Sequence, residues 1–367
     1  MVTLKLLLAI SAIKQWHTLQ LDVNNAFLNK DLNEEVYMDL PQGLNTNTFS
    51  DHAGPQLPCK LHKLIYGLRQ SSRQWYIKFS QELQQTGFTQ SQDDYVLFTQ
   101  GLGTDFITLL VYVDDIVLGG PNLHCLQQLQ DTLNTSFKLK TLGTLKYFLG
   151  FEIARSSKGT FLSQHQYTLQ LLEDTGYLGS KPVATPMDPK IKLNTSDGEP
   201  LLDPSQYRRL VARLLYLTLS RPDITLSVHF LSQFLANPKT PHLQAAHHLL
   251  RYLKVKPDQG LLYPTSSSLH LRAFSNSDWA SCPTTRRSTT GICVFLGDCL
   301  ISWRSKKQPT ISRSSTEAEY HALAATASEL TWIQYLLADF HLHQQSPSFI
   351  YCDNKSAIHI ANNPTFS

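Results

Sequence analysis

Apolar and polar positions along the first part of the chain predict alternating helices and strands. Near the N-terminus, apolar residues at 4, 7, 8 and 12 have helical spacing and predict an amphipathic helix that packs in the core. A secretory leader is the alternative, but no small-residue cleavage pattern follows, and the apolar run is too short to span a bilayer. Further along, residues 109–113 and 116–118 are rich in β-branched and aromatic side chains. They predict two strands joined as a hairpin at Asp114-Asp115.

The second half of the chain begins with a change of composition. Residues 182–204 hold five prolines in 23 positions and predict a linker or a long surface excursion. Three helices are expected after it, at 205–219, 223–236 and 241–255. Strands are then expected at 269–274 and 290–303, a helix at 314–337 and a last strand at 348–352. The pattern therefore predicts an α/β (α+β) protein with an N-terminal α/β domain, a helical connector and a second α/β domain.

Composition narrows the class of protein. The 367 residues are 42% hydrophobic and 17% charged, which fits two or three folded domains. A net charge of +3 neither demands nor excludes nucleic acid. The six cysteines form no CxxC pair, so we expect free thiols in a reducing compartment, cytoplasmic or nuclear. No stretch approaches 18 uninterrupted apolar residues, so no membrane partner is expected, and the absence of HExxH argues against a catalytic zinc.

The paired charges of Asp114 and Asp115 need an explanation, because they interrupt apolar strands. Two unit charges ~4 Å apart repel by roughly 4 kcal/mol at an effective dielectric constant of 20. A divalent cation would remove that cost, and an acidic turn is the alternative. Asp22 follows the strand-like residues 18–21 and fits either a metal ligand or a strand-end cap. Three aspartates in one place suit two Mg²⁺ ions roughly 3.5–4 Å apart, as in polymerases and nucleases.

Several sequence blocks resemble the Pol proteins of copia-type (Ty1/copia) retrotransposons. They are YVDD at 112–115, QLDVNNAFLNKDLNEEVYMDLPQG at 20–43, CKLHKLIYGLRQSSRQWY at 59–76, YFLGFEIARSSKGTFLSQHQY at 147–167, DPSQYRRLVARLLYLTLSRPDI at 203–224 and SSTEAEY at 314–320. The resemblance runs along essentially the whole chain. It implies a reverse transcriptase palm with partial fingers at 1–181, the Pro-rich linker at 182–204, a helical thumb or connection at 205–263 and a ribonuclease H-like domain at 264–367.

The resemblance also assigns roles in DNA synthesis. Asp22, Asp114 and Asp115 would be the catalytic residues and metal ligands of an RNA-directed DNA polymerase, with two Mg²⁺ ions or, alternatively, Mn²⁺. The implied partners are an RNA template, a DNA primer and dNTPs. Residues implied in binding them are Phe27, which would select dNTPs, Tyr112 of the YVDD box, Arg69, Arg73 and Gly150 of the primer-gripping loop. Alternatives from the residues alone are core packing for Phe27 and a strand bulge for Gly150.

Other features of the first half carry open alternatives. The cations Lys60, Lys63, Arg69, Arg73 and Lys78 alternate with aromatic residues, which suits phosphate contact and base stacking, or else a solvated helix face. The family usually has proline before Arg73, where this chain has Ser72. The second acidic pair, Asp93-Asp94, is expected to be a turn and a helix-end cap.

A second carboxylate set lies in the last hundred residues. Asp278 ends a predicted strand, Glu319 lies in the first turn of a predicted helix, and Asp353 follows another strand. By resemblance to ribonuclease H, these three would bind two Mg²⁺ ions and hydrolyse the RNA strand of an RNA–DNA hybrid. Glu317 is expected to cap the helix, because Ser314-x-x-Glu317 matches a capping box.

Basic residues separate these acids. Residues 286–313 carry six cations against one acid, Asp298: Arg286, Arg287, Arg304, Lys306, Lys307 and Arg313. Of these, Arg286, Arg287, Lys306 and Lys307 are expected to bind the hybrid duplex. A charged edge strand that deters aggregation is the alternative.

The resemblance further implies that segments are missing at both ends. The fingers segment that holds the incoming triphosphate would precede residue 1, and a fourth ribonuclease H ligand would follow residue 367. Three hypotheses follow: an active reverse transcriptase with ribonuclease H, a catalytically defective remnant, and a nucleic-acid-binding module without chemistry. The sequence does not indicate an oligomeric state.

Overall fold

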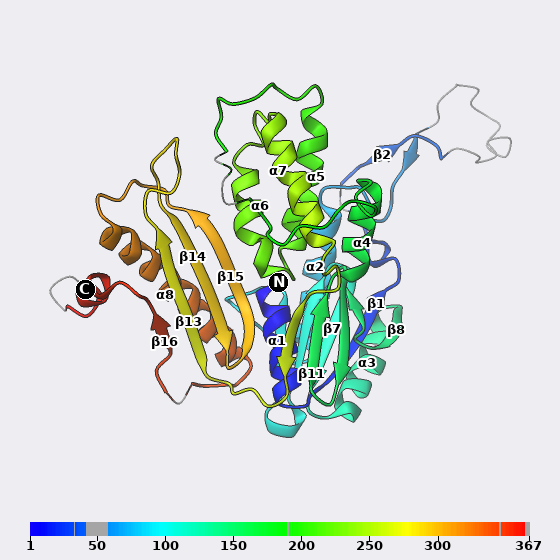
Figure 1. Ribbon diagram of the computed structural model, residues 1–367. Coiled ribbons are helices and arrows are strands. Elements are labelled where there is room, and N and C mark those ends of the chain that lie inside the picture. The colour runs from blue at the N-terminus through cyan, green and yellow to red at the C-terminus, as the bar shows by residue number, and fades with distance from the viewer. Residues whose placement is uncertain (33, 42–57, 189–190, 192, 345, 364–367) are drawn as a thin grey trace. The chain divides into compact units, whose positions relative to one another are not determined.

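The computed structural model describes residues 1–32, 34–41, 58–188, 191, 193–344 and 346–363 (Figure 1). They divide into two compact units, one formed by Thr18–Thr144 and the other by Met1–His17 together with Leu145–Ser367. The expected domain ranges 1–181, 182–204, 205–263 and 264–367 stay predictions. Within the described residues, no helix combines the length and apolar character needed to cross a membrane.

The Thr18–Thr144 unit is built on a six-stranded sheet in the order β4-β5-β6-β7-β1-β8. The strands are β1 (His17–Val23), β4 (Thr89–Gln90), β5 (Leu97–Gln100), β6 (Ile107–Tyr112), β7 (Asp115–Gly120) and β8 (Leu139–Thr144). Two further short strands, β2 (Tyr37–Met38) and β3 (Cys59–Lys60), pair with each other. The 3₁₀ turns η1 (Ala26–Asn29) and η3 (Gly103–Asp105) lie between strands.

Helices α2 (Ser71–Gln85) and α3 (Leu123–Ser136) supply the other half of this core. Trp75 and Phe79 of α2 are fully buried, and both rings pack on Phe137 at centroid distances near 5 Å (5.2 and 5.0 Å). Apolar side chains of the central strands β1, β6 and β7 complete the cluster. Burial on this scale is the main force that fixes the sheet beneath the hairpin. The chain accepts Ser72 in place of proline because it lies in the first turn of α2, where either residue fits.

In the other unit, helix α1 (Val2–Ile13) is confirmed as the expected core helix. Every residue from Thr3 to Ala12 is buried, including Lys5. The helix contacts β11, β12 and β15, so strands of this unit pack against it. A helix that is apolar on nearly all sides belongs inside a core.

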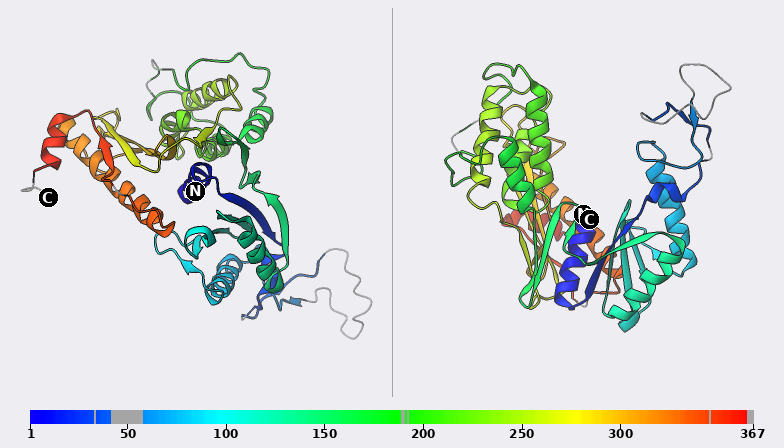
Figure 2. Two further views of the ribbon diagram at one scale, coloured as in Figure 1. Left: turned by 90° about the horizontal axis from the view of Figure 1, so that it is seen from below. Right: turned by 90° about the vertical axis from the view of Figure 1, so that its right-hand side faces the viewer.

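The same unit contains a four-stranded sheet in the order β12-β11-β10-β9. Its strands are β9 (Tyr147–Phe148), β10 (Phe151–Ser156), β11 (Gly159–Ser163) and β12 (Leu261–Pro264). The three expected helices are confirmed as α5 (Pro204–Leu217), α6 (Thr225–Ser232) and α7 (Thr240–Leu253). With α4 (His165–Asp174) and the turn η4 (Pro222–Ile224), they share one apolar core, and Figure 2 shows α5, α6 and α7 side by side.

The described part of the proline-rich segment 182–204 is hydrogen-bonded to helix α7. His248 bonds the carbonyl of Thr185 through Nε2 (2.9 Å), and His242 bonds that of Asn194 through the same ring nitrogen (2.9 Å). The Leu193 side chain is buried in the helical core. The segment is therefore an excursion packed on the helices.

The C-terminal part forms a second four-stranded sheet in the order β15-β14-β13-β16. Strands β13 (Leu271–Asp278), β14 (Thr289–Leu296) and β15 (Cys299–Lys307) are antiparallel neighbours, and β16 (Phe349–Tyr351) runs parallel to β13. The long helix α8 (Ser315–Asp339) lies along this sheet, and α9 (Lys355–Ala361) follows β16 (Figure 1). The six cysteines are free, as expected.

Candidate functional site

The β6–β7 hairpin carries the first acidic set, with its apex one residue earlier than expected. Tyr112 pairs with Asp115, so Val113 and Asp114 form the two-residue turn and Asp115 begins β7. Val113 has φ 60°, a conformation that costs a β-branched residue on the order of 1–3 kcal/mol. Two bonds stabilise this strained turn: Trp75 donates from Nε1 to the Val113 carbonyl (2.7 Å), and the Val23 amide donates to the Asp114 carbonyl (2.9 Å).

Strand β1 brings Asp22 to this hairpin, because β1 is the neighbour of β7 in the sheet. Burial raises the pKa of the Asp115 carboxyl, and the nearby charges of Asp114 and Asp22 raise it further, whereas a hydrogen bond from Gln20 opposes the change. The three aspartates are therefore close enough to repel one another. All three aspartates are partly buried.

Tyr66 joins this acidic set to Phe27. Its hydroxyl donates to Asp114 Oδ2 (3.0 Å), and its ring meets the Phe27 ring edge-on at 4.4 Å between centroids. Burial raises the pKa of the Tyr66 hydroxyl, and the bond to Asp114 raises it further, which keeps the phenol protonated as the donor. Phe27 is 4% exposed and belongs to the core cluster, as the packing alternative stated. The sequence offers Tyr66 only as one of the aromatic residues that alternate with cations in residues 59–76, and its 48-residue separation from Asp114 gives no sequence signal for this bond.

The remaining candidate residues of the first half have different surroundings. Arg69 and Arg73 are exposed, Arg73 in the first turn of α2. Burial raises the pKa of the Tyr112 hydroxyl strongly. Asp93 and Asp94 form a turn in which both amides donate to Ser91 Oγ (3.1 and 3.0 Å). The turn lies between β4 and β5, so the expected helix-end cap is wrong.

Gly150 lies in a tight turn between β9 and β10, where Phe148 pairs with Phe151, so the strand-bulge alternative is wrong. Leu149 and Gly150 both have positive φ, 47° and 74°, as a two-residue hairpin turn requires. A Cβ on Gly150 would lie 2.3 Å from the Tyr216 hydroxyl, which itself bonds the Leu149 carbonyl. The turn and this contact are sufficient to require glycine.

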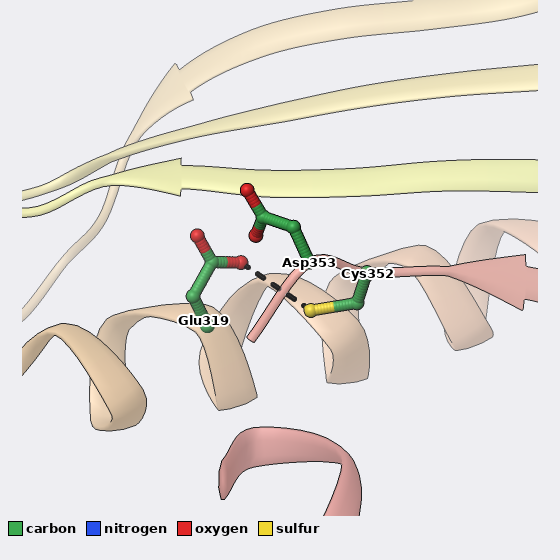
Figure 3. Close-up of side chains that lie close together, drawn as sticks. All are labelled: Glu319, Cys352 and Asp353. Carbon is green, nitrogen blue, oxygen red and sulfur yellow. Dashed lines mark hydrogen bonds between the residues drawn. The ribbon is translucent and has the colours of Figure 1, made fainter. Parts of the chain in front are cut away.

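The second acidic set meets at the C-terminal sheet. Glu319 of α8 is 5% exposed, and its Oε1 accepts the Ser277 amide (2.8 Å) next to Asp278, the exposed last residue of β13. Burial raises the pKa of Glu319, the Ser277 amide lowers it, and the charge of Asp353 raises it. Figure 3 shows the Glu319 and Asp353 carboxyl groups facing each other beside the Cys352 thiol.

Cys352 is the member of this set that sequence reasoning missed. Its Sγ lies 3.7 Å from Glu319 Oε2. In the described part of the chain, one group of three metal-ligating atoms lies within 4.8 Å of one another, and it consists of Glu319, Cys352 and Asp353. This group does not include Asp278 or the aspartates of the hairpin. The only sequence signal for Cys352 is its position immediately before Asp353.

Glu317 caps α8, as expected. The Glu317 amide donates to Ser314 Oγ (3.1 Å), and its carboxylate accepts the Arg313 amide (2.7 Å). Glu317 and Glu319, two residues apart in α8, therefore have different partners.

The basic residues of 286–313 differ in their contacts. Arg286, Arg287 and Lys306 are exposed. Arg304 forms an ion pair with Glu329 (2.6 Å), and Lys307 donates to Gln233 Oε1 (2.7 Å) and Cys282 Sγ (3.3 Å). In the first half, Lys60 pairs with Glu35 and Lys78 bonds the Asn29 carbonyl. Arg304 and Arg313 are exposed as well, and Arg304 is taken up by its ion pair with Glu329.

Comparison with known proteins gives a match to one family model and similarity to polyproteins that are longer than this chain. Residues 1–189 match the family model described as reverse transcriptase (RNA-dependent DNA polymerase). The chain is 42% identical over 364 residues to the retrovirus-related Pol polyprotein from transposon RE1 of Arabidopsis thaliana, which covers 99% of this chain and 24% of the relative. It is 34% identical to the corresponding polyprotein from transposon TNT 1-94 of Nicotiana tabacum, covering 100% of this chain and 28% of the relative.

The match to a shorter relative covers almost the whole length of that relative. The uncharacterized mitochondrial protein AtMg00810 of Arabidopsis thaliana is 46% identical over 224 residues, which are 61% of this chain and 93% of the relative. Against the two Pol polyproteins, by contrast, the chain spans about a quarter of their length.

Proposed function

The chain belongs to the reverse transcriptase (RNA-dependent DNA polymerase) family and is similar to copia-type Pol polyproteins, and from this premise we propose that Asp22, Asp114 and Asp115 form its polymerase centre. The reaction is template-directed DNA synthesis from an RNA template, a DNA primer and dNTPs. The observation that supports it best is the electrostatic coupling of the three carboxyl groups at the strand-β1 and hairpin junction.

The donor chemistry fits the proposed metal. Carboxylate oxygens are the ligands that Mg²⁺ prefers, and clustered negative charge is stabilised by a divalent cation. Two bound Mg²⁺ ions, or Mn²⁺, would supply activation of the primer hydroxyl and neutralisation of the leaving pyrophosphate. The protein's part is to fix the carboxylates, and the bonds from Trp75 and Val23 to the turn carbonyls do so.

The neighbouring side chains suit substrate positioning. Tyr66 bonds Asp114 and packs on Phe27, so a change in Phe27 would be transmitted to an acid of the centre. This supports the role of Phe27 in selecting dNTPs, although its ring is also part of the core. Tyr112, Arg69, Arg73 and the Gly150 turn are proposed to contact the dNTP or the template–primer.

A primer-extension assay tests the polymerase proposal. On poly(rA)/oligo(dT) with Mg²⁺, we expect incorporation that falls at least about a hundredfold in Asp114→Asn, because loss of a metal ligand costs at least as much as loss of its supporting bonds. Asp93→Asn is the matched control, since it removes an acid from a turn outside the centre. Incorporation that persists in Asp114→Asn would mean that the centre is misassigned. No incorporation by the unaltered chain would support the defective remnant.

A second activity is proposed for the C-terminal sheet, namely ribonuclease H with Asp278, Glu319 and Asp353 as ligands of two Mg²⁺ ions. The juxtaposition of Glu319 with Asp353, and its bond to the residue before Asp278, support this. Arg286, Arg287, Lys306 and Lys307 are proposed to bind the RNA–DNA hybrid.

Cleavage of a labelled hybrid tests the second activity. Glu319→Gln and Asp278→Asn should each abolish cleavage, whereas Glu317→Gln should retain it and lose only the cap, worth ~1 kcal/mol of stability. The three variants are compared at equal folded fraction, measured by circular dichroism. Cleavage that survives in Asp278→Asn contradicts the proposed ligand set.

A further inference from the structure

We propose that a cavity at the C-terminal end of α1 binds the phosphate group of a phosphorylated ligand, with Arg155 as the cation that recognises it. The cavity has a volume of about 430 Å³. Sites for small molecules occupy about 300–1,000 Å³, so a phosphate group with part of its parent molecule fits. The cavity shares no residue with either acidic set, so this inference goes beyond both proposed activities.

Segments of the Met1–His17 and Leu145–Ser367 unit form the cavity. They are the end of α1 with the residues that follow it, the β10–β11 hairpin and the residue after β12, and α1 contacts both β11 and β12 (Figure 1). Of the described residues that line the cavity, none is an aspartate or a glutamate. The lining instead includes an arginine and several residues with hydroxyl side chains, namely Ser11, Arg155, Ser156, Ser157, Thr160 and Thr265. Hydrogen-bond donors with a positive charge and no competing carboxylate suit an anion.

Arg155 brings an uncompensated positive charge to this cavity. Its Nη1 donates to the Trp16 carbonyl (3.0 Å), and among the described residues it forms no ion pair. A guanidinium carries several N–H donors, so most of them stay available for a ligand. The side chain keeps access to solvent, while desolvation by its surroundings lowers the pKa of Arg155. A bound anion would offset that loss of hydration, and the planar fork of arginine matches phosphate oxygens.

Ser11 is a second, independent indication of a ligand. It is 2% exposed and lines the same cavity, yet its Oγ has no hydrogen-bond partner in the described part of the chain. A helical serine can donate to the carbonyl one turn earlier, as Ser328 does to Ala324 in α8 (3.0 Å). Because buried polar groups are nearly always paired, a phosphate oxygen is a suitable acceptor for the Ser11 hydroxyl.

The alternative explanation is that Arg155 only stabilises the end of α1. A cation near the last carbonyls of a helix is favourable, and the Trp16 carbonyl lies just beyond that end. Under this alternative a water molecule would pair with the Ser11 hydroxyl, and phosphate would not bind saturably. Arg155→Gln would then change only the stability of the fold.

Equilibrium dialysis of the full chain against radiolabelled inorganic phosphate distinguishes the two explanations. We expect saturable binding that Arg155→Gln weakens at least about tenfold, because the substitution removes a charge-assisted bond. Arg155→Lys should weaken binding less, since it keeps the charge without the fork. Ser11→Ala should weaken it about three- to tenfold, the effect of one lost hydrogen bond. Arg209→Gln is the matched control and should retain binding, because this exposed arginine of α5 lies outside the cavity, near Asp203 (3.7 Å).

Competition against the labelled phosphate identifies the source of the phosphate group. The competitors are dAMP, deoxyadenosine and a single-stranded oligonucleotide without a terminal phosphate. Displacement by dAMP alone would assign the cavity to small phosphomonoesters, whereas displacement by the oligonucleotide as well would assign it to a nucleic-acid backbone. Displacement by deoxyadenosine would show that the base is recognised in place of the phosphate and would contradict the inference.

Two further results would overturn the inference: no saturable phosphate binding by the unaltered chain, or binding that is undiminished in Arg155→Gln. Circular dichroism of each variant verifies that the fold is retained. If Arg155→Gln does not fold, equal phosphate binding by Ser11→Ala and the unaltered chain would overturn the inference instead. The readout requires neither DNA synthesis nor hybrid cleavage, so it is independent of both proposed activities.

Discussion

At the scale of single residues, Lys5 is a lysine buried in a helix of the core. It is 4% exposed in a helix whose other buried residues are mostly apolar, and its Nζ lies 3.4 Å from the centroid of the Trp303 ring. Burial lowers the pKa of Lys5 from 10.5 to about 7, because the charged form loses its hydration. The ring face favours the charged form but offsets only part of that loss.

Lys5 therefore makes stability depend on pH. Between pH 7 and 10.5 the unfolded chain binds a proton at Lys5 that the folded chain does not, so the free energy of unfolding should rise with pH across this window. Below pH 7 both states are protonated and the full penalty remains, ~5 kcal/mol at most from ~1.4 kcal/mol per pKa unit. Lys5→Met should thus stabilise the chain at pH 6.5 and much less at pH 9.5, as measured by urea unfolding.

Lys14→Met is the control for this prediction, since Lys14 is exposed at the end of the same helix. It should change stability equally at both pH values. If Lys5→Met changed the free energy of unfolding equally at pH 6.5 and 9.5, the lowered pKa of Lys5 would be contradicted.

At the scale of elements, helix α2 and the β6–β7 hairpin act together. Trp75 is fully buried in α2, and its indole N–H satisfies the Val113 carbonyl of a turn with positive φ. The bond links the packing of the helix to the position of Asp114. The local sequence of either element does not predict this bond, because Trp75 and Val113 are 38 positions apart.

Removing that bond should affect stability and DNA synthesis together. Trp75→Phe removes the indole donor and leaves the partly buried Val113 carbonyl without it, at a cost of ~1 kcal/mol in the free energy of unfolding. We expect primer extension to fall by more than the folded fraction does, because the strained turn shifts. The control is Trp279→Phe, which loses a comparable bond to the Ser312 carbonyl (3.0 Å) in the other unit. Equal losses of extension in both variants would refute a specific role for the hairpin bond.

At the scale of the whole molecule, affinity for nucleic acid must arise from local charge, because the net charge is only +3. Arg286 and Arg287 are exposed beside β14, whereas Arg304 is already paired with Glu329. An ion pair reduces the counterions that a cation releases on contact with phosphate.

The salt dependence of hybrid binding should reflect this difference. Arg286→Ala and Arg287→Ala should each reduce the log–log slope of the binding constant against salt by ~0.9. Arg304→Ala should leave the slope nearly unchanged. The measurement is fluorescence anisotropy with a labelled hybrid over a range of salt concentrations. A slope near zero for the unaltered chain would mean that it makes few phosphate contacts. That result would contradict both the polymerase and the nucleic-acid-binding module and would support the defective remnant.

The sequence by itself predicted helix α1, the β6–β7 hairpin, helices α5, α6 and α7, most elements of the C-terminal sheet and the resemblance to copia-type Pol proteins. These follow from local patterns: apolar periodicity, capping residues such as Ser314 with Glu317, and contiguous motifs such as YVDD. Such patterns act between residues a few positions apart.

Only the tertiary structure decided which distant side chains meet. The contacts of Tyr66 with Asp114, Trp75 with Val113, and Cys352 with Glu319 join segments tens of residues apart, and that of Lys5 with Trp303 joins the two halves of one unit. The turn register at Val113-Asp114 and the burial of α1 on all sides were also decided there. The physical reason is that long-range packing selects among arrangements that local propensity leaves equal in energy.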